Sequence, residues 1–153
     1  MEELDISGAL ARFSSYSLSP FERVLLGHTG TVQLLLSLYF GSPVTVKVLQ
    51  QSQDNAEIKR HSSLVVSSSG REICSAYSVI PLNLNRRDIV SDILEKKLGI
   101  GQIAAKHRVA ASREINKITV SNSEISRAYT LIGSEMQVSV VESFHRDYLR
   151  AGS

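Results

Sequence analysis

Six stretches of the chain show the pattern of β-strands, in which apolar and polar residues alternate or β-branched residues gather. In residues 44–49, for example, every second residue is a valine, so one side of the strand is apolar and the other is wet. The predicted strands cover residues 44–49, 57–66, 72–80, 108–119, 126–132 and 137–145. Short polar or glycine-containing segments join several of them as hairpins, which predicts antiparallel pairing.

Four other segments have helical features. They are residues 2–12, a helix with Pro20 in its first turn, residues 31–40 and residues 86–98. Gly41 and Gly99 follow the last two segments, and we expect them to end those helices. Because helical segments stand before and between groups of strands, rather than alternating with them, the pattern predicts an α+β fold built on a mostly antiparallel sheet of about six strands.

Composition narrows the class of protein. The 153 residues predict one domain spanning residues 1–153, and 42% hydrophobic with 21% charged residues is ordinary for a soluble globular protein. The net charge of +2 comes from mixed charges, so no cationic face for nucleic acid is expected. The longest apolar run, around Leu34 to Leu36, is too short for a membrane span. The acidic start and the single cysteine, Cys74, predict a cytoplasmic protein.

Familiar catalytic and cofactor motifs are missing from the sequence. It has no phosphate loop of the Gly-x-x-x-x-Gly-Lys type and no dinucleotide-binding Gly-x-Gly-x-x-Gly. It also has no Cys-x-x-Cys and no His-x-x-x-His, so neither a zinc site nor another metal is expected. We therefore expect a site that works without metal or organic cofactor.

Two lone charged side chains on segments that otherwise have the pattern of buried strands indicate where that site lies. Arg60 opens the segment 60–66, and Glu142 stands near the end of the strand 137–145. Charged side chains are rarely buried without a partner or a ligand. The pair therefore indicates a pocket for a small anionic molecule, with Arg60 gripping a carboxylate through two parallel hydrogen bonds and Glu142 handling a proton. A structural ion pair, or two strand ends exposed to water, is the alternative.

Backbone groups and one more arginine complete the set of candidates. The N–H groups near Gly30 and Thr31, and those near Ile100 and Gly101, lie at expected helix starts and could hold the same anion. These glycines also fit the simpler role of cap and turn. The strand 126–132 places Arg127, Tyr129 and Leu131 on one face of the sheet. That face is either the pocket face or the wet face.

The order of these segments resembles the chorismate lyase (chorismate pyruvate-lyase) family, including its archaeal and cyanobacterial members. The likeness runs from about residue 25 to residue 144 and rests on order and spacing. The segments that carry it are Gly30-Thr31 leading to Leu34-x-x-x-Leu38 and Gly41, Arg60-x-x-x-Leu64, Ala76-Tyr77-Ser78-Val79-Ile80-Pro81, Gly99-Ile100-Gly101 and Val140-Val141-Glu142-Ser143-Phe144.

This resemblance implies a sheet with helices packed on one face and a site beneath helical flaps. It implies the conversion of chorismate to 4-hydroxybenzoate and pyruvate, with a ring-bearing carboxylic acid as substrate. By position, Arg60 matches the arginine that binds the ring carboxylate, and Gly30 and Ile100 fall where backbone groups help to hold it. Glu142 matches the glutamate that faces the ring hydroxyl and the leaving enolpyruvyl group. In an apolar cavity, desolvation would disfavour the charged form of Glu142 and make it a usable acid or base.

The resemblance has departures and rivals. His28 and Thr29 stand where the family often has an acidic residue, and the alignment of Arg60 depends on a longer hairpin at residues 67–70. Without that extra length, Ser62 takes the place of the arginine. The same fold serves as an effector-binding domain in some bacterial transcription regulators, although only about 20 residues precede the first firm helix here. A binding module for an aromatic acid, or an enzyme acting on a related acid, is the alternative function.

Overall fold

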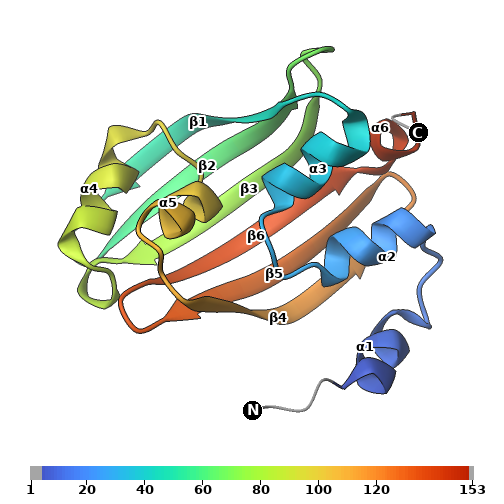
Figure 1. The fold of residues 1–153 in the computed structure, drawn as a ribbon, viewed down its shortest axis with the longest axis horizontal. Helices are drawn as coiled ribbons and strands as arrows, with labels where there is room; N and C mark the ends of the chain where they lie inside the picture. The colour runs from blue at the N-terminus through green and yellow to red at the C-terminus, as the bar shows by residue number, and fades with distance from the viewer. Residues whose placement is uncertain (1–4, 152–153) are drawn as a thin grey trace.

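The computed structural model describes residues 5–151. They form an open six-stranded sheet in which every neighbouring pair is antiparallel, in the order β1-β2-β3-β6-β5-β4 (Figure 1). The first three strands and the last three each form a meander, and β3 pairs with β6 to join them. The strands are β1 (Val44–Gln53), β2 (Glu57–Val66), β3 (Glu72–Pro81), β4 (Ala111–Val120), β5 (Glu124–Gly133) and β6 (Gln137–His145).

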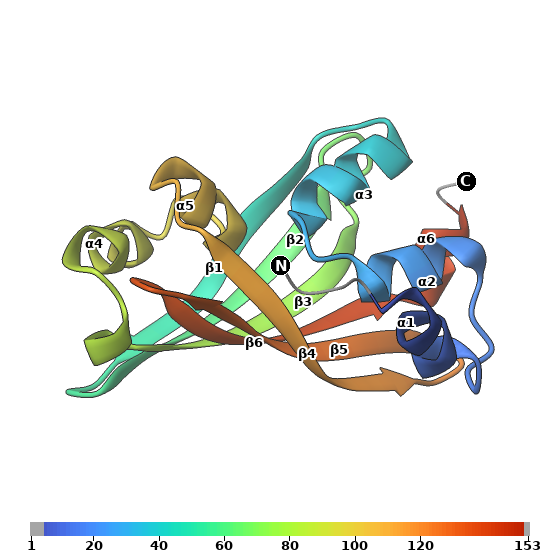
Figure 2. The ribbon, with the colours of Figure 1, turned by 60° about the horizontal axis from the view of Figure 1, so that its bottom comes forward.

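The helices lie over one face of this sheet, as Figure 2 shows for α2, α3, α4 and α5. The expected α+β fold, with an antiparallel sheet and helices on one side, is therefore confirmed. The helices are α1 (Ile6–Phe13), α2 (Pro20–Gly27), α3 (Val32–Phe40), α4 (Arg87–Glu95), α5 (Ile100–Lys106) and α6 (Arg146–Ala151), with a 3-10 turn at Leu82–Leu84. Residues 2–4 of the expected helix 2–12 lie outside the described residues, and α6 was not predicted.

Local chemistry explains where α2 and α3 begin and end. Ser19 and Glu22 form a reciprocal capping box at the start of α2, with Pro20 in the first turn as expected. Gly41 ends α3 with a φ of 63°, a left-handed conformation that favours glycine. Thr31 is the residue before α3 but makes no capping hydrogen bond through its side chain. Thr31 therefore occupies the capping position of α3 without capping the helix through its side chain.

The expected helix 86–98 is shorter than predicted, and a second helix follows it. The structure ends α4 at Glu95, and Lys96 takes a left-handed conformation with a φ of 60°. Gly99 does not end this helix; it is the residue before α5. A Cβ on Gly99 would lie 2.9 Å from Cγ2 of Val46, so the absence of a side chain allows α5 to start close against β1. The prediction that Gly99 caps residues 86–98 was wrong because this packing cannot be read from local sequence.

The helix-covered face contains two hydrophobic clusters rather than one. The first gathers under α2 and α3 and includes Leu25, Leu36 and Phe144, and the second gathers under α4 and α5. On each of the four central strands, polar or charged residues facing the helices stand between members of the two clusters. We call four of these residues the polar belt, namely Ser62, Ser78, Arg127 and Glu142, and Arg60 is a further buried charged residue on the same face of β2.

Candidate functional site

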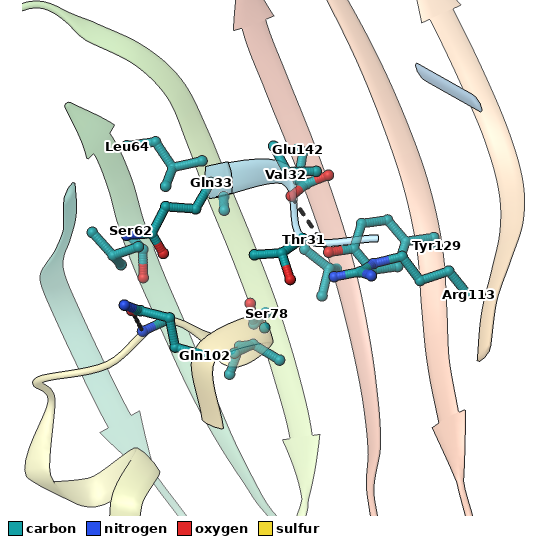
Figure 3. Close-up of a pocket in the computed structure, with 16 residues that line it drawn as sticks. Thr31, Val32, Gln33, Ser62, Leu64, Ser78, Gln102, Arg113, Tyr129 and Glu142 are labelled. Carbon is teal, nitrogen blue, oxygen red and sulfur yellow. Dashed lines mark hydrogen bonds between the residues drawn. The ribbon is translucent and has the colours of Figure 1, made fainter. Parts of the chain in front are cut away.

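A small cavity lies over the polar belt, beneath the N-terminal ends of α3 and α5 (Figure 3). Its volume is about 60 Å³, which is room for a few water molecules but far below the roughly 300–1,000 Å³ of typical ligand pockets. It lies at the seam between the two hydrophobic clusters, so its wall mixes apolar and polar groups. The lining residues are Thr31, Val32, Gln33, Val46, Ser62, Leu64, Ala76, Ser78, Gly99, Ile100, Gly101, Gln102, Arg113, Tyr129, Val140 and Glu142.

Glu142 faces this cavity, as the sequence predicted, but it is not a lone charge. Arg127 is its direct partner across the β5–β6 ladder, and Arg127 Nε donates to Glu142 Oε1 at 2.8 Å. Arg127 is fully buried and its Nη1 donates to the backbone carbonyls of Leu26 and His28. The pair therefore joins the centre of the sheet to the end of α2. The alternative of a structural ion pair holds for Glu142, with Arg127 rather than Arg60 as its partner.

The second oxygen of Glu142 is more loosely held. The Tyr129 hydroxyl donates to Glu142 Oε2 at 3.4 Å, a long hydrogen bond. Burial raises the pKa of Tyr129, and the negative charge of Glu142 raises it further. The hydroxyl therefore stays protonated and remains a donor. This oxygen has capacity for another hydrogen bond from the cavity side.

Arg60 is buried, but it does not line the cavity. Its Nη2 donates to the carbonyl of Ile93 at 2.6 Å and its Nη1 to the carbonyl of Leu98 at 2.8 Å, while its Nε donates to Gln51 Oε1 at 2.8 Å. A cation at the end of α4 also suits the helix dipole. Burial lowers the pKa of Arg60 to about 10. Arg60 thus holds the α4–α5 connection on the sheet, and the expectation that it grips a ligand carboxylate in this cavity is not supported.

Ser62, two residues after Arg60 on β2, lines the cavity instead of Arg60. Side chains two residues apart share one face of a strand, so alternation alone cannot distinguish the two positions. The identity of the residue in the cavity depends on which position lies beneath the gap between α3 and α5. The structure thus places Ser62, rather than Arg60, in the wall of the cavity.

Three of the four predicted backbone positions reach the cavity. Thr31, Ile100 and Gly101 line it, and they come from the beginnings of α3 and α5. Gly30 is not among the lining residues. A Cβ on Gly30 would lie 2.7 Å from Nε2 of His28, so its lack of a side chain leaves room for the imidazole ring. Gly30 therefore has a packing role in this structure.

Arg113 is the charged residue of the cavity that sequence reasoning missed. It comes from the edge strand β4 and its guanidinium carbon lies 5.2 Å from the centre of the Tyr129 ring (Figure 3). Its Nη1 donates to the carbonyl of Thr29 at 2.6 Å. The available signal was alternation, because Arg113 shares a strand face with the half-buried Ile115. That signal does not reveal a cavity, since many strand arginines cover their own sheet with their stems.

The charges around the cavity do not balance. Arg113 and Arg127 bring two cationic guanidinium groups, and Glu142 is the one carboxylate among the residues of the cavity wall and the polar belt. Burial lowers the pKa of the adjacent His28, and the charges of Arg127 and Arg113 lower it further, so its imidazole is neutral near pH 7. The cluster therefore carries one positive charge in excess, which favours an anion.

No protein-family model matches the sequence, and no curated protein matches it significantly. Within residues 5–151, no three histidine, cysteine, aspartate or glutamate side chains are placed so as to hold a metal ion together. Over the same range, no helix has the length and hydrophobicity needed to cross a lipid bilayer.

Proposed function

We propose that the cavity binds a small ring-bearing carboxylic acid, and that the protein eliminates pyruvate from chorismate to give 4-hydroxybenzoate. The observation that carries the binding proposal is the excess positive charge of Arg113 and Arg127 over Glu142 at a covered site. In a site shielded from water, a ligand carboxylate that neutralises this charge is favoured much more than it would be at the surface. The choice of chorismate comes from the family resemblance.

The wall of the cavity also suits a ring with polar substituents. Leu64, Ala76 and Val140 supply an apolar floor from three strands, while Ser62 and Ser78 supply hydroxyl groups beside it. A planar or nearly planar ring can lie on such a floor while its substituents reach the polar groups at the edge. Ligand sites commonly combine a mainly apolar lining with a few placed polar groups.

The proposed reaction needs one group that moves a proton. The bond between the ring and the enolpyruvyl oxygen breaks, and the ring carbon that carries the hydroxyl loses its proton. The enolpyruvate takes up a proton at its methylene carbon and becomes pyruvate, so the atoms balance without water or a redox partner. Because Arg127 holds one oxygen of Glu142 and the side chain faces the cavity, we assign Glu142 the role of the base that accepts the ring proton. Aromatisation supplies much of the driving force, so orientation is the other main task.

Ligand entry requires the helices above the cavity to move, because about 60 Å³ does not hold a ring acid. A groove of about 330 Å³ runs between α3 and α5 on the outer side, and Thr31, Gln33, Gly101 and Gln102 line both this groove and the cavity. These four residues are therefore the thin wall between the cavity and solvent. Separation of the two helix ends would join the groove and the cavity into a site of ligand size.

A binding protein without turnover is the second candidate, and the ion pair itself favours it. Arg127 holds Glu142 through a hydrogen bond of 2.8 Å, which fits a glutamate with a structural role as well as one that moves a proton. The protein would then bind an aromatic acid and return it unchanged. Turnover separates the two functions.

The test is to incubate the purified protein with chorismate and to measure 4-hydroxybenzoate and pyruvate together, against a control without protein. Equal amounts of both products, above the control, are expected. If neither exceeds the control, lyase activity is contradicted, and calorimetric titration with 4-hydroxybenzoate then tests the binding function. The absence of both turnover and binding would contradict the whole proposal.

A further inference from the structure

We propose that Arg113 is the residue that binds the ligand carboxylate in this cavity and selects acids over neutral molecules of the same shape. This inference deepens the proposed function, because it names the group that recognises the acid. It rests on three features of the Arg113 side chain, which are an unsatisfied buried donor, an open space beside it, and anchors that hold the guanidinium plane.

The unsatisfied donor is Nε of Arg113. This atom is buried, and within residues 5–151 it has no hydrogen-bond partner. Buried polar groups are nearly always paired, so such a donor indicates an acceptor that arrives with a ligand or with water. The donor belongs to a residue that lines the cavity, so the acceptor is expected there.

The open space lies beside Nη2, on the same edge of the guanidinium as Nε. A Cβ added to Gly101 would lie 3.6 Å from Nη2 of Arg113 and 3.5 Å from Cγ2 of Thr31, so a methyl group there would occupy this space. The two N–H groups of an Nε–Nη2 edge are parallel and match the two oxygens of a carboxylate. Gly101 thus leaves access to an edge that can bind a carboxylate with two hydrogen bonds.

Two anchors hold this edge in place. Nη1, on the opposite side of the guanidinium, donates to the carbonyl of Thr29 at 2.6 Å. The Tyr129 ring lies 5.2 Å from the guanidinium carbon, within the range of a cation–π contact. Because the same Tyr129 donates to Glu142, an acid bound at Arg113 lies in the cavity that Glu142 faces.

Two buried arginines near the cavity, Arg60 and Arg127, are less suited to this role. Arg60 is outside the cavity, with each of its three nitrogens already donating. Arg127 is fully buried behind Glu142 and does not line the cavity. Its own unpartnered Nη2 is therefore out of reach of a ligand that lies in the cavity.

The experiment compares 4-hydroxybenzoate with 4-hydroxybenzamide, a neutral ligand of nearly the same shape, by calorimetric titration of the full chain. The parent protein should prefer the acid by at least about tenfold, which corresponds to about 1.4 kcal/mol. Arg113→Met should abolish this preference. Arg113→Lys should keep a part of it, because the positive charge and a donating group remain while the parallel pair of N–H groups is lost. Arg60→Met is the matched control and should keep the full preference, with circular dichroism and thermal melting confirming that each variant is folded.

A preference that survives in Arg113→Met, or one that is lost in Arg60→Met alone, would overturn the inference. If the parent binds neither compound but converts chorismate, the KM for chorismate decides, and an unchanged KM in Arg113→Met would overturn it. An acid preference that depends on Arg113, without any conversion of chorismate, would support this inference and contradict the lyase proposal. The two proposals therefore fail in different experiments.

Discussion

Residues 5–151 contain two buried arginine–glutamate pairs that look alike as contacts but differ in how completely their hydrogen-bonding groups are satisfied. In the pair under α2, Arg146 Nε donates to Glu22 Oε2 at 2.7 Å and Nη2 donates to Glu22 Oε1 at 2.9 Å. The remaining donors of Arg146 reach the carbonyls of Ser121 and Ser17. This pair uses both carboxylate oxygens and all three guanidinium nitrogens, and it ties α2 and α6 to two loops.

The pair in the polar belt is incomplete. Arg127 makes one hydrogen bond to Glu142, at 2.8 Å, and its Nη2 has no partner within residues 5–151. The second oxygen of Glu142 accepts only the long bond from Tyr129. Closed networks stabilise a fold, whereas the weakly held second oxygen of Glu142 faces the cavity and leaves hydrogen-bonding capacity that a ligand can use. The difference between the pairs therefore separates a structural site from a candidate functional site.

Breaking the complete pair should have the largest effect. Arg146→Met leaves the Glu22 carboxylate buried without compensation, so we expect the free energy of unfolding to fall by about 3–5 kcal/mol. Urea denaturation measures this change. Arg23→Met, which removes an exposed arginine of the same helix region, should change stability by less than about 0.5 kcal/mol. A loss below about 1 kcal/mol in Arg146→Met would contradict the structural role.

Neutralising each glutamate in turn should sharpen the comparison. Glu142→Gln removes the proposed base while it keeps the shape of the side chain, so kcat for chorismate should fall by about 100- to 10,000-fold. Glu22→Gln should lower stability but leave kcat unchanged at a temperature where the variant is folded. Steady-state kinetics on both variants provide the test. Equal kcat in Glu142→Gln and the parent would remove Glu142 from the chemistry.

The complete pair should also contribute to the pH dependence of stability. Burial alone would raise the pKa of Glu22, but hydrogen bonds and the charge of Arg146 outweigh it, so the pKa is lowered from 4.5. A carboxyl group with a lowered pKa in the folded state stabilises the protein above its unfolded pKa, and this stability is lost as the pH falls through the folded pKa. The stability difference between the parent and Glu22→Gln should therefore shrink below about pH 4.5. Urea titrations between pH 7 and pH 3 measure it, and a difference that is constant with pH would contradict the assignment.

Removing the long hydrogen bond to Glu142 should have the smallest effect. Tyr129→Phe deletes only the hydroxyl that donates to Oε2 at 3.4 Å. We expect kcat to fall by about two- to tenfold, because the variant loses one long hydrogen bond from a neutral donor to a charged acceptor. Tyr77→Phe, on the exposed face of the sheet, should have no effect on kcat. A loss in Tyr129→Phe as large as that in Glu142→Gln would give Tyr129 a direct role in proton transfer.

Alternation along the chain was enough to predict which residues share a face of the sheet, but it left open which face the helices cover. It placed Arg127, Tyr129 and Leu131 on one face, and all three are buried beneath the helices. It also predicted that Glu142 lies on a largely apolar strand. The register of the ladders was not available from alternation, and it is the register that sets Glu142 directly opposite Arg127. The ion pair therefore could not be predicted from either strand alone.

The sequence by itself determined the six strands, most helix positions and the α+β class, because each depends on local spacing and on residues such as Pro20 and Gly41. Only the tertiary structure decided the role of each arginine. Arg60 and Arg113 are both strand arginines, yet one supports the end of α4 and the other lines the cavity. The physical reason is that a guanidinium takes its role from the acceptors brought to it by distant segments, and those segments meet only in the folded chain.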